Sequence, residues 1–236
     1  MLNPLSSAPG GQVAAHAAVD RFARVEFEAG PRRPLHEGRW ANALVYTFER
    51  DGAQWVVKDF RPRAWLVRNV IGRVLIRREA RGLQKLAGVP GAPADAFCID
   101  AYALAYRFVP GRGLRRHAGA LGPDFFAQLE RAVAEMHTRA RIVHLDLRNA
   151  DNILVTASGE PMLLDFQSHL SLGWMPGPLR RLTQRIDLAA IYKHWAKRSP
   201  DTIGPERLAE LDRINGLSLL WPIRGYAGSS RTGRKS

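Results

Sequence analysis

Residues 144–155 read HLDLRNADNILV, and the polar groups in this stretch decide how the rest of the chain is interpreted. Asp146 stands in a polar loop between two apolar segments, where a carboxylate is costly unless it is used or well hydrogen-bonded. Arg148 follows two positions later, and its guanidinium could neutralise a transferring phosphoryl group. Asn152 directly precedes the apolar run ILV, so its amide oxygen could turn back towards a metal ion. The stretch therefore predicts a catalytic loop that leads into a strand.

Three further polar residues stand where the same chemistry would need them. Lys58 ends the β-rich run WVVK, Glu79 lies 21 residues later in a helical segment, and Asp165 follows the short apolar run PMLL. Phosphoryl transfer from a nucleotide needs cations for the phosphates, oxygen ligands for Mg²⁺ and a carboxylate that orients the attacking hydroxyl. Taken singly, Lys58 and Glu79 would be interpreted as surface residues. Their order along the chain, together with the loop, favours a phosphotransferase.

The composition sets broad limits. A chain of 236 residues can form one large domain or two lobes. No apolar run approaches the roughly 18 residues needed to span a bilayer, and the first residues lack the pattern of a signal peptide. The single cysteine, Cys98, cannot form an internal disulfide, which indicates a reducing cytoplasm; we expect it to be a small core residue. The 35 Lys and Arg against 22 Asp and Glu leave a net charge of +13, which favours anionic partners.

The pattern of apolar residues divides the chain into two parts. The run ALVYTFERDGAQWVVKDF predicts two strands joined at Asp51–Gly52, and the segment from Trp65 to Lys85 has helical spacing with arginines on its other face. A second turn is expected at Ser158–Gly159, and the chain after it is mostly helical. The expected domains are a flexible or helical segment (1–30), a strand-rich lobe with one helix (31–105), a mainly helical lobe (106–226) and a disordered basic tail (227–236).

Together these motifs resemble the protein-kinase-like superfamily over roughly residues 35 to 195. The run VVKDF is similar to the third-strand lysine motif and RREARGLQKL to the helix after it, which implies that Glu79 holds Lys58. HLDLRNADNILV resembles the catalytic loop, which implies that Asp146 acts as base or orients the acceptor and that Arg148 contacts phosphate. LLDFQ resembles the magnesium loop, which implies that Asp165 and Asn152 bind the metal.

The resemblance also implies a fold and two small-molecule partners. LAYRFVPGRGL is similar to the hinge between lobes, whose backbone around Tyr106 and Arg107 would receive adenine. The expected fold is therefore two-lobed α+β, with an antiparallel sheet and one helix in the first lobe and a short, mainly helical second lobe. ATP and Mg²⁺ would bind between the lobes.

Several positions depart from the pattern of protein kinases. The stretch EGRWANALVY, ahead of Lys58, holds only Gly38 where the family has a glycine-rich loop, and Gln167 stands where the magnesium loop has glycine. The catalytic loop is one residue longer, so either Asn152 or Asp151 faces the metal; Asn152 is favoured because it directly precedes the strand. No A-P-E sequence follows Asp165. These features resemble short bacterial branches, the lipopolysaccharide (Kdo or heptose) kinases and the RIO-type kinases.

The acceptor expected from this branch is a hydroxyl of a lipopolysaccharide-core sugar. The alternatives are an atypical serine/threonine protein kinase of the RIO type and a non-catalytic nucleotide-binding pseudokinase. The basic helix Trp65 to Lys85 and the run WMPGPLRRLTQR (174–185) suit peripheral contact with an anionic membrane at its cytoplasmic face; alternatively both are solvated, with Trp65 and Trp174 packed inward. No nucleic-acid-reading module is present, and sequence-specific binding of nucleic acid is not expected.

Overall fold

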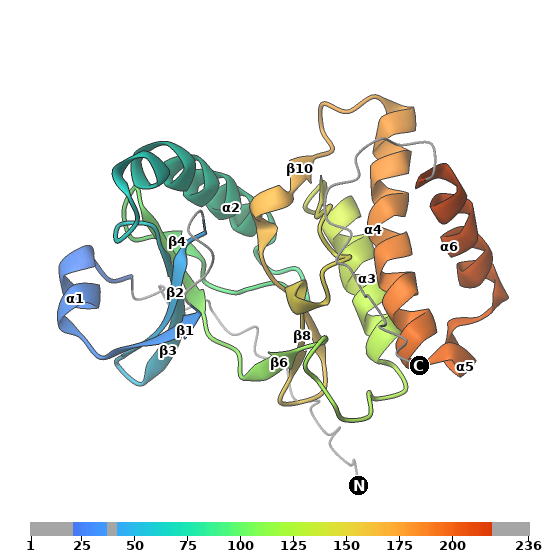
Figure 1. Cartoon of the computed structure of the whole chain (residues 1–236), viewed down its shortest axis with the longest axis horizontal. Helices are drawn as coiled ribbons and strands as arrows, with labels where there is room; N and C mark the ends of the chain where they lie inside the picture. The colour runs from blue at the N-terminus through green and yellow to red at the C-terminus, as the bar shows by residue number, and fades with distance from the viewer. Residues whose placement is uncertain (1–20, 37–41, 219–236) are drawn as a thin grey trace, which may run out of the picture.

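The computed structural model describes residues 21–36 and 42–218, which fold into two lobes (Figure 1). The first lobe is built on an antiparallel sheet with the strand order β1-β2-β3-β5-β4. Its strands are β1 (Arg32–His36), β2 (Leu44–Arg50), β3 (Ala53–Asp59), β4 (Phe97–Cys98) and β5 (Ala103–Arg107). Gly38 and the basic tail 227–236 lie outside the described residues.

The expected turn at Asp51–Gly52 joins β2 and β3, and both of its residues have positive φ, 50° and 73°. This conformation costs little for glycine and is tolerated by aspartate, which is why the pair is a strong hairpin signal. The register pairs Val45 with Lys58. Because side chains alternate along a strand, Val56 and Lys58 share the face that looks towards the second lobe, and Trp55 faces the opposite side.

The outer face of the sheet is covered by a short helix, α1 (Arg24–Ala29), which lies within the segment expected to be flexible or helical (Figure 1). Phe22 and Phe27 pack with Trp55 in a separate apolar cluster on this face. Arg24 holds the helix to the sheet through ion pairs with Asp59 at 2.7 Å and Asp100 at 2.9 Å. Cys98 is exposed on the edge strand β4, so the prediction that it is a core residue is wrong.

A long helical segment crosses from the first lobe to the second. It runs through Trp65 and Leu66 and a π-helical stretch, η1 (Val67–Gly72), and continues as α2 (Arg73–Lys85). Gly82 lets α2 approach the second lobe closely, since a Cβ there would lie 3.0 Å from the His169 ring. The Arg78 guanidinium donates to the His169 carbonyl at 2.6 Å. These contacts fix α2, and Glu79 on it, against the second lobe.

The second lobe combines helices with short strands. Its helices are α3 (Phe125–Thr138), α4 (Gly177–Arg198), α5 (Pro200–Ile203) and α6 (Pro205–Ser218). Its strands are β6 (Gly111–Gly113), β7 (Ile142–Val143), β8 (Ile153–Thr156), β9 (Pro161–Leu163) and β10 (Leu170–Ser171), with 3₁₀ turns η2 (Ala150–Asn152) and η3 (Phe166–Ser168). The hairpin β8–β9 turns at Ser158–Gly159, as expected. The two-lobed α+β fold predicted from the sequence is confirmed.

One apolar core runs through both lobes, from Val56 and Leu104 under the sheet to Leu129 and Ile191 in the helices. Burial of this continuous core holds the lobes in one arrangement. Within the described residues, no helix is both long and apolar enough to cross a bilayer.

Candidate active site

A cleft of about 370 Å³ opens between the two lobes. Val45 and Val56 from the sheet line it on the side of the first lobe, and Leu154 and Met162 from the β8–β9 hairpin line it on the side of the second lobe. Apolar walls of this kind suit a flat aromatic ring. The polar end of the cleft carries Lys58, Asn152, Asp165 and Gln167.

Lys58 joins the two lobes at the polar end. Its Nζ lies 2.6 Å from Glu79 Oε1 on α2 and 2.9 Å from Asp165 Oδ1 in the second lobe. Lys58 and Glu79 are buried, and the Asp165 side chain is 42% exposed towards the cleft. The sequence placed these three residues far apart, and the fold brings them into one contact.

The pKa values of Lys58 and Asp165 both shift in the direction that keeps these two groups charged. Burial by itself would lower the pKa of Lys58, but the carboxylates of Glu79 and Asp165 outweigh it and raise that pKa above its usual value. Burial would likewise raise the pKa of Asp165, but the Lys58 ammonium outweighs it and holds that pKa below its usual range. At neutral pH the site therefore presents a fixed ammonium and an ionised carboxylate to the cleft.

The backbone at Asp165 is in the left-handed region, with φ 62°, immediately before η3. This conformation is uncommon for a residue with a side chain and occurs where surrounding structure holds it in place. Gln167 stands where the magnesium loop of protein kinases has glycine. Its Nε2 donates to Glu79 Oε2 at 3.3 Å. The unusual residue therefore adds a contact to the carboxylate that holds Lys58.

The catalytic-loop stretch brings Asp146 and Asn152 together. Asn152 Nδ2 donates to the Asp146 carboxylate at 2.8 Å and to the Asp146 carbonyl at 2.9 Å. The extra residue is absorbed by the 3₁₀ turn η2, in which Asn149 accepts from the Asp151 N–H. Burial raises the pKa of Asp146, while the hydrogen bond from Asn152 opposes this shift and nearby Asp165 adds to it.

The other two charged residues of the loop point elsewhere. Asp151 pairs with Arg115 Nε at 2.9 Å on the second lobe, although it also lines the cleft. Arg148 is exposed, and among the described residues it has no ion pair. The structure therefore sets Asn152 beside Asp146 and leaves Arg148 at the surface of the loop.

Asp187 on α4 anchors the loop, and the sequence analysis missed it. Its carboxylate accepts from the His144 N–H at 2.7 Å, from the Leu145 N–H at 2.8 Å and from His137 Nε2 at 3.0 Å. Leu145 has φ 66°, so these bonds hold a strained backbone directly before Asp146. The sequence pattern that could have indicated Asp187 is its spacing of four residues from Thr183 and from Ile191, which puts an acidic side chain on the buried face of α4.

His144 holds the loop through both of its ring nitrogens. Its Nδ1 accepts from the Asp146 N–H at 3.3 Å, so the proton sits on Nε2, which donates to the Leu164 carbonyl at 2.8 Å. The ring packs on Phe166 with centroids 4.8 Å apart. One imidazole thus connects the loop of Asp146 to the segment that carries Asp165.

The segment that joins the lobes follows β5. The Tyr106 side chain is buried beside Lys58 and lines the cleft, and burial raises its pKa to about 12. Arg107 also lines the cleft, but its backbone N–H donates to the Ala94 carbonyl at 3.0 Å. Its guanidinium lies 4.1 Å from the Trp55 ring centroid and 2.8 Å from Asp95. The Arg107 N–H is therefore already bonded within the fold.

The donor set at the polar end fits a hard divalent cation. Among the described residues no group of three or more His, Cys, Asp or Glu forms a complete metal cage. Mg²⁺ usually takes one or two protein oxygens and completes its shell with water and substrate phosphates. Asp165 and Asn152 both line the cleft, and their carboxylate and amide oxygens are the ligands that would hold it; the Asn152 oxygen here accepts from Asn149 Nδ2 at 3.2 Å.

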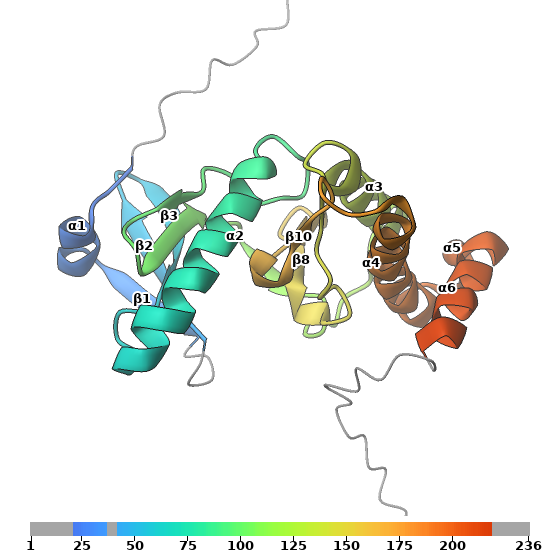
Figure 2. The same cartoon turned by 90° about the horizontal axis from the view of Figure 1, so that it is seen from above.

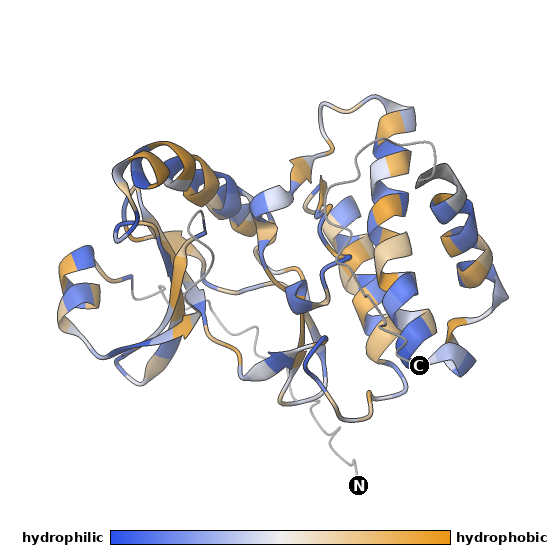
Figure 3. Cartoon of the chain, viewed as in Figure 1, coloured by the Kyte–Doolittle hydropathy of each residue, from blue (hydrophilic) through white to orange (hydrophobic). Residues whose placement is uncertain are grey.

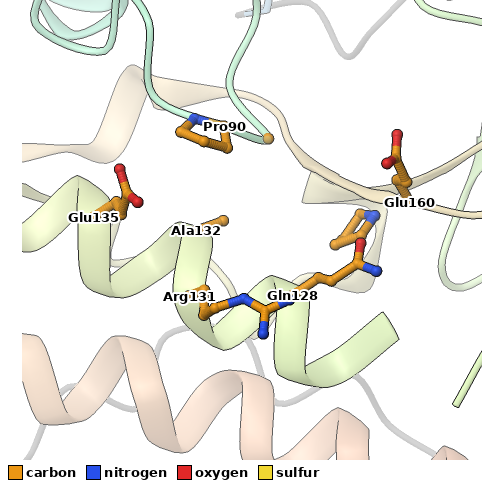
Figure 4. A pocket seen from close by; sticks show the side chains of 8 residues that line it. Pro90, Gln128, Arg131, Ala132, Glu135 and Glu160 are labelled. Atoms are coloured by element: carbon orange, nitrogen blue, oxygen red, sulfur yellow. The ribbon is translucent and has the colours of Figure 1, made fainter. Parts of the chain in front are cut away.

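A second hollow, of about 340 Å³, lies away from these residues, between α3 and the β8–β9 turn (Figure 4). Gln128, Arg131 and Glu135 line it from α3, and Glu160 lines it from the turn. None of the polar residues of the cleft or of the loop 144–155 described above lines it.

Comparison with known proteins places the fold. The sequence matches no family model and no curated protein. Two solved structures of the Rio2 kinase from Chaetomium thermophilum are similar, one of them an ADP/Mg²⁺-phosphoaspartate complex, with TM-scores of 0.51 for that complex and 0.54 for the other. Identity is 17% in both cases, and the match covers 75% of this chain but only 60% and 61% of the Rio2 chains, so this chain spans about three fifths of their length. The chain has a protein-kinase-like fold.

Proposed function

We propose that the protein is an ATP- and Mg²⁺-dependent phosphotransferase that moves the γ-phosphate to an acceptor hydroxyl. The observation that carries this proposal is the contact of Lys58 with both Glu79 and Asp165 at the end of an apolar cleft. A scaffold would have little reason to bury a lysine between two carboxylates at a cleft, because buried ion pairs contribute little net stability.

Each residue then has a role that follows from its place. Lys58 would bind phosphate oxygens of the nucleotide, while Glu79 keeps the ammonium in position. Mg²⁺ bound by Asp165 and Asn152 would neutralise charge on the phosphates. Asp146, whose pKa is raised by burial, would accept a hydrogen bond from the acceptor hydroxyl and orient it. Arg148, exposed on the loop, would contact the incoming anionic group.

For the acceptor, we propose the hydroxyl of a glycolipid sugar such as those of the lipopolysaccharide core. The net charge of +13 supports an acidic acceptor. The second candidate is a hydroxyl on a protein, supported by the similarity in fold to a Rio2 kinase. A third outcome is transfer to a carboxylate of the protein itself, since a phosphoaspartate is present in that Rio2 complex.

Nucleotide binding is tested first, by thermal denaturation with ATP, with and without Mg²⁺. A ligand that binds only the native state raises its melting temperature. We expect a Mg²⁺-dependent rise in the wild type that is lost in Asp165→Ala. No rise with any nucleotide would contradict the proposal and favour a non-catalytic kinase fold.

The acceptor is then identified with γ-labelled ATP and three acceptors: purified lipopolysaccharide, a protein mixture and the enzyme alone. Label in lipopolysaccharide that disappears in Asp146→Ala supports the glycolipid acceptor. Label in protein alone supports the RIO-like alternative. Label on the enzyme that hydroxylamine removes indicates an acyl phosphate.

A further inference from the structure

One side of the molecule combines exposed apolar and basic residues from both lobes. On the helical segment, six exposed positions form one stripe that is apolar at its start and basic at its end, and we call it the helix stripe: Leu66, Val70, Val74, Arg77, Arg81 and Lys85. Figure 3 shows the same change along this segment, orange towards its beginning and blue towards its end. Large apolar side chains in such a row are unusual on the surface of a soluble domain.

A tryptophan lies at each end of this surface. Trp65, just before the helix stripe, is 68% exposed, and Trp174, in the connection between β10 and α4, is 67% exposed. The interpretation in which both tryptophans pack inward is therefore wrong. Leu179, Arg180 and Arg181 follow Trp174 at the exposed start of α4.

The two segments form one surface. Lys85 Nζ, at the end of the helix stripe, donates to Ser171 Oγ in β10 at 3.0 Å, three residues before Trp174. Figure 1 shows α2 and the β10–α4 connection along the same upper edge, and Figure 2 looks down on both. We call this surface the tryptophan face.

The tryptophan face is strongly basic. On the helix stripe the exposed charged residues are Arg77, Arg81 and Lys85, and the one acidic residue of this segment, Glu79, is buried against Lys58. Between residues 166 and 186 the chain has three arginines and no acidic residue. Of these three, Arg185 is paired with Glu210, whereas Arg180 and Arg181 are exposed.

We propose that the tryptophan face docks on the surface of an anionic lipid bilayer. Tryptophan settles at the boundary between headgroups and acyl chains, and aliphatic side chains enter the acyl region beside it. Arginines around such a patch gain from the negative surface potential of anionic lipids. Charge complementarity thus favours a bilayer over an apolar protein surface, and the proposal does not depend on phosphotransfer.

The experiment is co-sedimentation of the full chain with phosphatidylcholine vesicles that contain phosphatidylglycerol, and with phosphatidylcholine vesicles alone, without nucleotide. We expect binding to the anionic vesicles that weakens as salt is added. Arg77→Gln with Arg81→Gln should weaken it roughly twenty-five-fold, at about fivefold per charge lost. Trp65→Ser with Trp174→Ser should weaken it by about tenfold or more.

The matched control variants lose the same kinds of side chain, one apolar and one basic, at positions away from the tryptophan face. Val25→Ser on α1 and Arg131→Gln on α3 change exposed residues and should leave vesicle binding unchanged. Two results would overturn the proposal: equal binding of the wild type to both kinds of vesicle, or unchanged vesicle binding by the double variant Trp65→Ser with Trp174→Ser. A third result would also overturn it: the wild type binds no vesicles and is a dimer in sedimentation equilibrium, while the double tryptophan variant is a monomer. The tryptophan face would then pair with a second copy of the chain.

Discussion

Asn152 donates to the Asp146 carboxylate at 2.8 Å although six positions separate them, one more than in the protein-kinase motif. The turn η2 takes up the additional residue and returns Asn152 to the Asp146 side chain. Asp151, at the position that the motif gives to asparagine, turns instead to Arg115. A loop can thus be lengthened without separating these two side chains.

This arrangement predicts different outcomes for two neighbouring substitutions. Asn152→Ala should lower the apparent affinity for Mg²⁺ in nucleotide binding roughly ten- to hundredfold, because it removes the proposed metal ligand that also hydrogen-bonds Asp146. Asp151→Ala should leave it unchanged, because it removes only a partly exposed ion pair with Arg115. Titration of Mg²⁺ at fixed ATP measures both. The reverse pattern would make Asp151 the ligand.

Asp146→Asn should separate activity from stability. A carboxyl whose pKa is raised by folding binds its proton more tightly in the folded state, so its ionisation lowers the free energy of unfolding as the pH rises past the unfolded pKa. Asparagine removes that penalty at neutral pH and can still accept from Asn152. We expect a melting temperature equal to or above that of the wild type, with turnover reduced about a hundredfold or more. Wild-type turnover would contradict the role given to Asp146.

The pair of Lys58 and Glu79 should behave as one unit in unfolding experiments. Lys58→Met leaves the Glu79 carboxylate buried without its main partner, and we expect a loss of roughly 3–5 kcal/mol in the free energy of unfolding. Lys58→Met with Glu79→Leu removes both charges and should recover most of that loss. Urea denaturation of the two single variants and the double variant measures the coupling. Additive losses would show that the two charges act independently.

Asp187 should matter for the loop although it does not line the cleft. Asp187→Ala leaves three donors without an acceptor, and we expect the free energy of unfolding to fall by roughly 3 kcal/mol and turnover to fall with it. Asp212→Ala, an exposed aspartate on α6, is the control and should change stability by less than about 0.5 kcal/mol. Equal stability of the two variants would show that the loop is held by other contacts.

Local patterns in the sequence were sufficient for the elements and for their order. The Asp51–Gly52 and Ser158–Gly159 turns, the strand of Lys58 and the helix of Glu79 each follow from neighbouring residues, because turn geometry and apolar spacing are short-range properties. The fold class followed from that order together with the motif resemblance. The bounds of helix α1 and its place on the sheet did not, since its six residues carry no strong helical pattern and it is held by Arg24 through residues far along the chain.

Only the tertiary structure decided which of these residues meet. The Lys58–Asp165 contact joins positions 107 residues apart, and Asp187 reaches back 43 residues to the His144 N–H. Whether Asn152 or Asp151 contacts Asp146 depended on the path of η2. The exposure of Trp65 and Trp174 depended on which face of each segment packs against the core. The sequence by itself determined which chemical groups are available and on which elements they lie. Their distances and their access to solvent arise from packing between distant segments, which no local pattern encodes.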